Sequence, residues 1–298
     1  MCRQLRSPLS GVPSARVARP VSAAHAVSAR LLFRVWRFVV TPGGMNPPEA
    51  PLRSTQLVLS ESVSVNDVVV GEDGVTRCFW AAGDMLAYHD LEWGRPVDDD
   101  WRLFEKLSLE GFQSGLSWLT ILRKRENFRH AFRGFDYVAV ARFNQRSVAR
   151  LLENAGIIRN RAKIEATINN ARRCIELVDE FGSLAAYAWS YEPRIEDRPT
   201  PLDRETLRQT TTSAEAVAMS KDLKGRGWAF VGPTTIYAFM QAMGLVNDHL
   251  TGCDVGKDVE HQRATFRRPA AASVDERRTG RQPERSSQRR RRSRPRSV

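Results

Sequence analysis

Apolar residues recur at helical spacing through most of the middle of the chain. In one such stretch they fall at Leu103, Phe104, Leu107 and Leu109, directly after three successive aspartates that are typical of a helix start. Comparable patterns predict helices over residues 101–113, 116–132, 145–154, 161–181, 213–226 and 234–245. Strand-like runs are few and short, and the best of them is 228–231. The pattern therefore predicts an all-α domain.

Basic charge is concentrated at the two ends of the chain. The net charge is +12, but residues 1–48 hold seven Arg and no acids, and residues 257–298 hold 14 Lys and Arg against five acids. The net charge of residues 71–256 is −2, so the basicity of the whole chain is no argument for a basic DNA-binding domain. Composition divides the chain into a basic N-terminal extension with a linker, a helical domain and an Arg-rich tail, at residues 1–75, 76–255 and 256–298. Both ends are expected to be disordered.

Three interpretations of residues 1–48 remain open. They resemble an organellar transit peptide in composition, they could form a basic arm that contacts nucleic acid, or the true start is Met45 and the preceding residues are an artefact or a disordered tail. The four consecutive arginines at 289–292 indicate either a solvated tail or nonspecific, salt-dependent attraction to phosphates.

The four cysteines are too few for a disulfide scaffold in a chain of 298 residues, which indicates a reducing compartment. They are Cys2, Cys78, Cys174 and Cys253. No run of about 18 apolar residues is present, so no membrane span is expected.

Two Cys/His pairs lie near the ends of the helical domain. Cys78 precedes His89, and His249 precedes Cys253 by four residues. Two thiolates and two imidazoles suit tetrahedral zinc, which would fasten the termini of the domain together. The spacing of the first pair fits no common zinc finger, however, and buried cysteines often serve as small hydrophobes. Spacing alone leaves both interpretations open.

A carboxylate and several aromatic residues indicate a possible pocket. Glu110 stands at the end of a predicted helix, ahead of a turn that contains glycine and leads to Trp118. Trp80, Tyr88 and Trp93 lie close to acidic residues in the sequence. Such a set suits a site that stacks and hydrogen-bonds a flat cationic base. The alternative is a solvated glutamate at a helix end together with ordinary core aromatics.

Residues 151–164 predict a helix, a tight turn at Gly156 and a second helix with Arg159, Arg161 and Lys163 near its start. The N-terminus of a helix exposes backbone N–H groups that bind phosphate well. The alternative is a plain helix–helix loop with a solvated basic face.

Taken in order, these segments resemble the 3-methyladenine DNA glycosylase I family of the helix-hairpin-helix superfamily. The similarity covers about residues 76–255. It is carried by Arg77-Cys78-x-Trp80, Ala87-Tyr-His-Asp-x-Glu-Trp-Gly94, Leu109-Glu-Gly111, Gly115-Leu-Ser-Trp118, Asn154-Ala-Gly-Ile-Ile-Arg-Asn-Arg161, Phe230-Val-Gly232 and Gly244-Leu-Val-Asn-Asp-His249. Each motif is short, but so many in one order are specific. The chain is shorter between Cys78 and His89 than is usual in the family, which affects the expected pocket wall and the position of Cys78.

The resemblance implies a helix-hairpin-helix glycosylase fold with a structural zinc that joins the termini of the domain. The implied zinc ligands are Cys78, His89, His249 and Cys253. The implied base pocket contains the catalytic carboxylate and four aromatics, namely Glu110, Tyr88, Trp93, Trp118 and Trp80. The implied DNA-binding residues are Gly115, Leu116, Gly156, Ile157, Arg159, Arg161 and Lys163.

The implied activity is hydrolytic release of 3-methyladenine from double-stranded DNA by a monomeric, cytoplasmic, nucleoid-associated enzyme; organellar import is the alternative that the N-terminus leaves open. Methylation at N3 makes the base a cation and a good leaving group, so extruding and holding it is most of the task. No lysine at the end of the hairpin suggests Schiff-base chemistry, so a monofunctional enzyme is expected. The alternative is a noncatalytic helix-hairpin-helix DNA-binding protein with a structural zinc.

Overall fold

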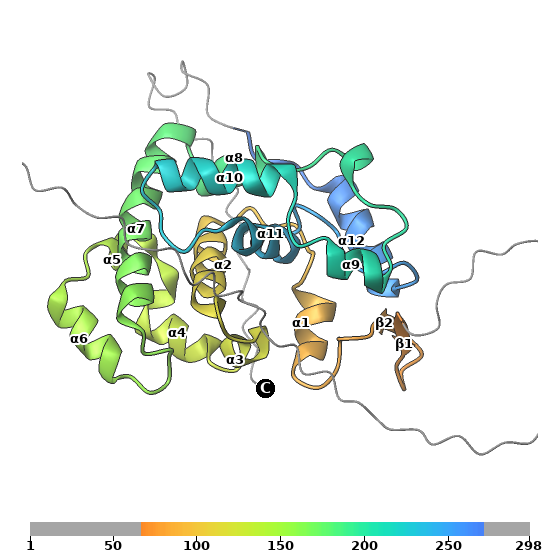
Figure 1. Cartoon of the computed structure of the whole chain (residues 1–298), viewed down its shortest axis with the longest axis horizontal. Helices are drawn as coiled ribbons and strands as arrows, with labels where there is room; N and C mark the ends of the chain where they lie inside the picture. Colours follow the sequence, from red (N-terminus) through yellow and green to blue (C-terminus); the bar gives the residue numbers. More distant parts are fainter. Residues whose placement is uncertain (1–66, 271–298) are drawn as a thin grey trace, which may run out of the picture. The chain divides into compact units, whose positions relative to one another are not determined.

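The computed structural model describes residues 67–270, and these residues are mostly helical. An antiparallel hairpin of β1 (Val68–Val70) and β2 (Thr76–Cys78) comes first. The helices that follow are α1 (Met85–Leu91), α2 (Asp100–Gln113), α3 (Trp118–Leu122), α4 (Arg125–Ala131), η1 (Arg133–Phe135), α5 (Tyr137–Ala141), α6 (Gln145–Glu153), α7 (Arg161–Phe181), α8 (Leu184–Trp189), η2 (Ile195–Asp197), α9 (Arg204–Gln209), α10 (Ala214–Gly225), α11 (Pro233–Ala242) and α12 (Asp254–Thr265) (Figure 1). The predictions for residues 1–48 and 289–296 lie outside the described residues.

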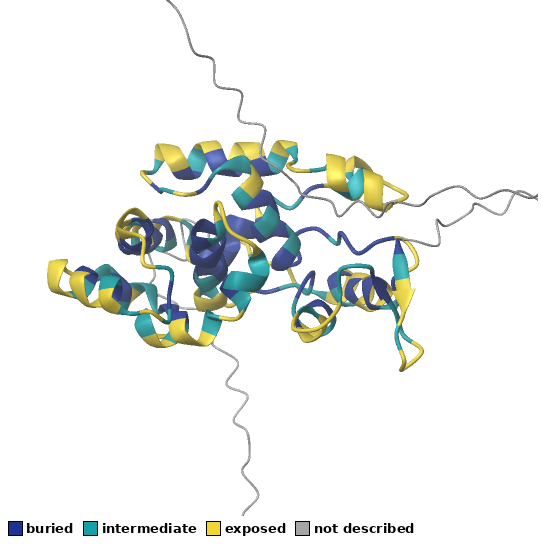
Figure 2. Cartoon of the chain, turned by 60° about the horizontal axis from the view of Figure 1, so that its bottom comes forward, coloured by how far each residue is buried: buried dark blue, intermediate teal, exposed yellow. Residues whose placement is uncertain are grey.

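Helix α2 is the centre of the core. Asp99 caps its N-terminus by accepting a hydrogen bond from the backbone N–H of Arg102, as the run of aspartates predicts. Nine of its 14 residues are buried, because α7, α8 and α11 all pack against it (Figure 2). Three polar residues of α2, Lys106, Ser108 and Glu110, are therefore buried, whereas Arg102 is exposed.

The predicted helix at 116–132 is two helices. Ser117 caps α3, and a turn at Arg123 and Lys124 separates α3 from α4. The Lys124 ammonium donates to the carbonyl oxygens of Ala155 (3.0 Å) and Gly156 (3.4 Å), which anchors the break to the turn before α7. The apolar spacing continues across the break, so the sequence pattern alone does not reveal it.

The predicted strand at 228–231 is an irregular segment. The side chain of Asn170, on α7, accepts a hydrogen bond from the backbone N–H of Ala229 (2.9 Å) and donates one to its carbonyl oxygen (2.8 Å). Phe230 then takes a left-handed conformation with φ of 57°. An asparagine amide thus takes the place that a neighbouring strand would occupy.

Secondary structure is present on both sides of residues 76–255, in β1 and in the last turns of α12. The backbone N–H of Thr76, in β2, donates to the Asp254 carboxylate at 2.9 Å, so the two ends of the domain meet. Near the end of α12, Arg263 is buried and pairs with Glu192 at 2.7 Å. Short helices such as α1, α5, α8 and α9 escaped prediction because each spans too few turns to show a period. None of the described helices is long and apolar enough to cross a membrane.

Candidate functional site

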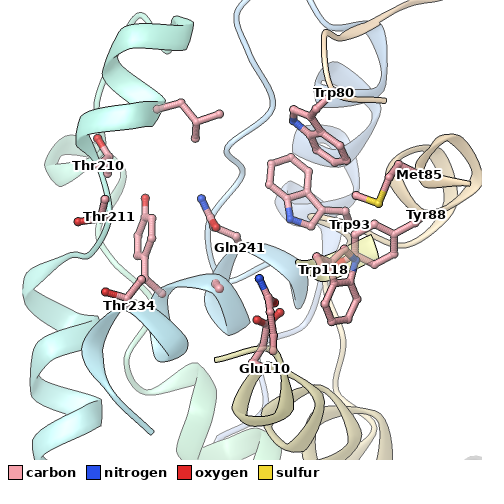
Figure 3. Close-up of a pocket in the computed structure, with 14 residues that line it drawn as sticks. Trp80, Met85, Tyr88, Trp93, Glu110, Trp118, Thr210, Thr211, Thr234 and Gln241 are labelled. Atoms are coloured by element: carbon pink, nitrogen blue, oxygen red, sulfur yellow. The ribbon is translucent and has the colours of Figure 1, made fainter. Parts of the chain in front are cut away.

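A cavity of about 350 Å³ opens beside the C-terminal half of α2. The structure brings all five predicted pocket residues to this cavity, namely Trp80, Tyr88, Trp93, Glu110 and Trp118. The aromatic residues and Met85 form one side, and the threonines at 210, 211 and 234 lie on the opposite side (Figure 3). The cavity is therefore apolar on one side and hydroxyl-lined on the other, with a carboxylate between them.

Local structure explains how the aromatic wall is formed. Tyr88 and His89 are the buried residues of α1, so the helix turns both toward the interior. The backbone N–H of Trp93 donates to the Tyr88 carbonyl at 2.9 Å, which folds the chain back after α1. Gly94 follows with φ of 79°, and a Cβ there would come within 2.9 Å of the His249 ring. This position therefore requires glycine both for its backbone conformation and for space.

Glu110 is buried and forms an ion pair within α2. Its Oε1 lies 2.7 Å from Nζ of Lys106, one turn earlier in the helix. The same ammonium donates to the Tyr88 hydroxyl at 2.8 Å and lies 3.2 Å from the centroid of the Trp118 ring. Burial lowers the pKa of Lys106. Sequence reasoning missed Lys106, although its spacing of four residues from a glutamate on a helix was an available signal.

Tyr88 can act as a hydrogen-bond donor toward the cavity. Its hydroxyl oxygen accepts the bond from Lys106. Burial, together with the nearby Glu110, raises the pKa of Tyr88 well above its usual value. The phenol therefore keeps its proton at physiological pH and can donate a hydrogen bond to a bound molecule.

The side of the cavity formed by α11 is held by a buried carboxylate. Tyr237 donates from its hydroxyl to Asp248 at 2.7 Å, and Gln241 donates from its amide to the same carboxylate oxygen at 2.8 Å. Burial raises the pKa of Tyr237, and the adjacent Asp248 raises it further. Tyr237 and Gln241 were not predicted as pocket residues. Their spacing of one helical turn was the signal that could have identified them.

Three of the four predicted zinc ligands form one buried cluster. The ligand atoms of Cys78, His89 and Cys253 all lie within 4.8 Å of one another. His89 contacts the Asp90 carboxylate through Nδ1 at 2.8 Å, and its Nε2 lies 3.7 Å from Cys253 Sγ. Such a carboxylate–histidine contact commonly orients a metal-bound imidazole. The short spacing between Cys78 and His89 therefore does not remove Cys78 from the cluster.

The fourth predicted ligand, His249, packs edge-on against His89 with 4.8 Å between ring centroids. Its Nδ1 lies 2.8 Å from the Asn247 side-chain oxygen, whereas its buried Nε2 has no hydrogen-bond partner among the described residues. Burial lowers the pKa of His249 to about 4, so the imidazole is neutral at physiological pH. A neutral ring with one free, buried nitrogen has the form that a metal ligand requires.

The two thiols share charge unequally. A hydrogen bond from Cys78 lowers the pKa of Cys253, while the resulting thiolate and burial raise the pKa of Cys78. The pair therefore accepts one negative charge readily and resists a second. A divalent cation would relieve that resistance, and two sulfur and two nitrogen donors match the preference of zinc.

The cluster and the cavity share an aromatic wall. Trp80 packs edge-on against both His89 and Trp93, with 4.9 Å between ring centroids in each case. Trp93 in turn packs against His249 at 4.7 Å. The orientation of both indoles in the cavity therefore depends on the position of the two histidines.

The predicted DNA-binding residues divide into exposed and buried groups. Gly115, with φ of 81°, and Leu116 lie exposed in the turn after α2. Arg159 and Arg161 are exposed at the start of α7, where Arg161 pairs with Glu165 at 3.1 Å. These four residues lie where a large ligand can reach them.

The remaining three predicted residues have internal roles. Ile157 is buried in the core, and the Gly156 N–H donates to Asn154 at 2.8 Å within the turn. Lys163 is also buried, and its ammonium donates to the carbonyl oxygens of Phe112 (2.8 Å) and Ser114 (2.6 Å). Lys163 is therefore not the exposed phosphate contact that the sequence predicted, because its ammonium binds carbonyl oxygens at the end of α2.

The residues that form the cavity lie within a region that matches a known protein family. The model of the methyladenine glycosylase family matches residues 80–256, which include the cavity and most of the Cys/His cluster. The chain belongs to the methyladenine glycosylase family.

Named relatives support this assignment. DNA-3-methyladenine glycosylase 1 of Escherichia coli (strain K12) is 48% identical over 180 residues, which cover 59% of this chain and 95% of the relative. The DNA-3-methyladenine glycosylase of Haemophilus influenzae is 43% identical over 181 residues, covering 60% and 96%. A solved structure on 3-methyladenine recognition by 3-methyladenine DNA glycosylase I from Staphylococcus aureus has a TM-score of 0.54 and 36% identity. It covers 59% of this chain and 92% of that chain. Family membership therefore rests on both sequence and fold.

Proposed function

We propose that this chain is a DNA-3-methyladenine glycosylase that releases 3-methyladenine from alkylated DNA and leaves an abasic site. The observation that carries the proposal is the buried Glu110 carboxylate at an aromatic-walled cavity, in a family whose named relatives are 3-methyladenine glycosylases. An anion among aromatic rings suits a flat, cationic base, because both attract positive charge.

The polar groups of the cavity also match adenine. Adenine presents an acceptor at N7 beside a donor at the N6 amino group. The Tyr88 hydroxyl supplies a donor, and the second carboxylate oxygen of Glu110 supplies an acceptor. Tyr88 and Trp118 lie 5.2 Å apart between ring centroids, so an extruded base that reaches Glu110 also meets aromatic surface.

The reaction needs little acid catalysis. The bond between base and sugar breaks with its electron pair going to the cationic base, which leaves neutral, and positive charge develops on the sugar. Water adds to the anomeric carbon and releases a proton to solvent. Among the described residues, the cavity lining includes no lysine, and Lys106 beneath it is engaged by Glu110 and Tyr88. This arrangement supports monofunctional hydrolysis rather than Schiff-base chemistry.

The substrate proposed is double-stranded DNA, bound by a monomer through a helix-hairpin-helix unit. Helix α6, the turn before Asn160 and helix α7 form the hairpin. The 21-residue α7 directs the positive end of its dipole toward the turn, and Arg159 and Arg161 add exposed charge there. The exposed Leu116 is suited to occupy the space that an extruded nucleotide leaves in the duplex.

A structural zinc completes the proposal. Cys78, His89, His249 and Cys253 would hold it, and the cluster joins β2 to the segment that precedes α12. Four protein ligands leave no open position, so the ion would stabilise the fold and the indoles packed against the histidines. The free Nε2 of His249 supports this assignment.

Chromatography of the bases released from alkylated duplex DNA tests the function. We expect 3-methyladenine in the soluble fraction and an equal number of abasic sites in the DNA. A noncatalytic DNA-binding protein would retain alkylated DNA without releasing base. That outcome, obtained with folded protein, would overturn the proposal.

A further inference from the structure

Lys106 is a buried cation that the reaction described above does not require. It projects from α2 beneath the cavity with about 5% of its surface exposed. Lysine is rarely buried without a specific partner, since desolvating an ammonium is costly. Three groups of the candidate base pocket surround its Nζ atom, and they come from three different helices.

The ammonium has three distinct neighbours. Its Nζ lies 2.7 Å from the Glu110 carboxylate, donates to the Tyr88 hydroxyl at 2.8 Å and lies 3.2 Å from the centroid of the Trp118 ring. Because the ammonium holds Oε1 of Glu110, the other oxygen remains for a ligand. Because it donates to the Tyr88 oxygen, the Tyr88 proton is directed elsewhere. One side chain thus sets the hydrogen-bonding polarity of two others.

The neighbouring charges leave Lys106 as the counterion of Glu110. Glu92 and Arg125 also face this region, but they pair with each other in two contacts of 2.5 and 2.8 Å. The ammonium of Lys163, from α7, is held by carbonyl oxygens at the end of α2. On the α11 side, the titratable group is Tyr237, which donates to Asp248.

We propose that Lys106 is a positioning residue for base recognition, which keeps Glu110 anionic inside the cavity and directs the Tyr88 proton toward the base. The inference rests on the proposed glycosylase function. A buried carboxyl without a cation favours its protonated form, which cannot offset the charge of a methylated base. With Lys106 in place, the free enzyme presents a carboxylate before the base arrives.

The pH dependence of kcat/KM for 3-methyladenine release tests this role, because it reports essential groups of the free enzyme. The variants are Lys106→Met, which replaces the ammonium with an apolar chain of similar length, and Lys106→Gln, which keeps a hydrogen-bond donor without charge. Lys221→Met, on the exposed face of α10, is the matched control. The full chain is used throughout, and thermal melts establish that each variant is folded.

We expect kcat/KM of the wild type and of Lys221→Met to vary by less than about twofold between pH 6 and pH 8.5. Both Lys106 variants should show an acid limb within this interval, with kcat/KM at pH 6 at least about tenfold below the value at pH 8.5, since a single protonation costs tenfold per pH unit. In the Glu110→Gln background, Lys106→Met should cause no further loss and should restore part of the rate, because its support acts through the carboxylate and its unpaired charge would repel a cationic base.

Several outcomes would overturn the inference. Flat pH profiles for both Lys106 variants would show that Lys106 does not maintain the anion. A normal profile in Lys106→Gln alone would assign the role to hydrogen bonding rather than charge. Additive losses in the double variant would show that Lys106 does not act through Glu110. If the wild type released no base, the proposed function would fail, and pH-dependent binding of free 3-methyladenine, followed by tryptophan fluorescence, would still test Lys106.

Discussion

Replacing Glu110 with Gln separates an enzyme from a binding protein. The change keeps the size of the side chain and an oxygen that can accept from Lys106, but it removes the charge that lies 2.7 Å from that ammonium. A charge-assisted hydrogen bond contributes about 1.5–3 kcal/mol. If the contact to the base is realised in the transition state, this corresponds to about one to two decades in rate.

A second effect acts in the same direction. Without the carboxylate, the Lys106 ammonium remains in the pocket and repels a cationic base. Two unit charges about 5.5 Å apart at an effective dielectric of about 20 interact with about 3 kcal/mol, although loss of the Lys106 proton would limit this cost. Burial already lowers the pKa of Lys106, so that escape is available. We therefore expect a fall in excision of about tenfold to a hundredfold or more.

The assay is single-turnover release of 3-methyladenine from alkylated duplex DNA, together with binding to DNA that contains an abasic-site mimic. Binding should change little, because the mimic has no base to hold. Glu105→Gln is the matched control, since Glu105 lies on the same helix and pairs with Arg129 at 2.8 Å outside the cavity. Excision by Glu110→Gln at the wild-type rate would refute the assignment of the pocket.

Three further predictions concern the metal, the hairpin and the ends of the chain. Elemental analysis should find about one zinc per chain. Cys253→Ala should lose the metal and lower Tm, whereas the protein that remains folded should keep most of its base-excision activity. Zinc should also dissociate as pH falls, because protons compete for the thiolates and imidazoles. Lys163→Met should lower Tm while leaving the salt dependence of DNA binding unchanged, whereas Arg159→Ala should make that dependence shallower by removing an exposed cation. A chain limited to residues 67–270 should keep base excision and show a shallower salt dependence than the full chain; equal slopes would mean that the basic ends do not contact phosphates.

Periodicity predicted the long helices and failed where tertiary contacts override local pattern. Helix α2 was anticipated from its apolar spacing and its aspartate cap. The strand expected at 228–231 was wrong because the Asn170 side chain, remote in sequence, occupies the backbone groups of Ala229. The break at Lys124 was missed for a similar reason, since its anchor lies about 30 residues further along the chain.

The candidate site could also be predicted from the sequence only in part. Similarity to a family located Glu110 and the aromatic wall, which composition and spacing could only suggest. Lys106 was missed and Lys163 was expected to contact phosphate, because a lysine on a helix is expected on the solvated face. Nine of the 14 residues of α2 are buried, and Lys106 is one of them. Lys163 finds the carbonyl ends of α2, which no local pattern reveals.

The contact made by Lys163 also has a geometric consequence. Its ammonium joins the first turn of α7 to the segment that leads into Gly115 and Leu116. In the proposed complex, these two regions meet the duplex at an anchored phosphate and at the extruded nucleotide. The Lys163 contact then fixes the distance between these two points before DNA binds. A shorter side chain at 163 would leave phosphate binding intact. It would make the enzyme less selective for the nucleotide at one set distance from the bound phosphate.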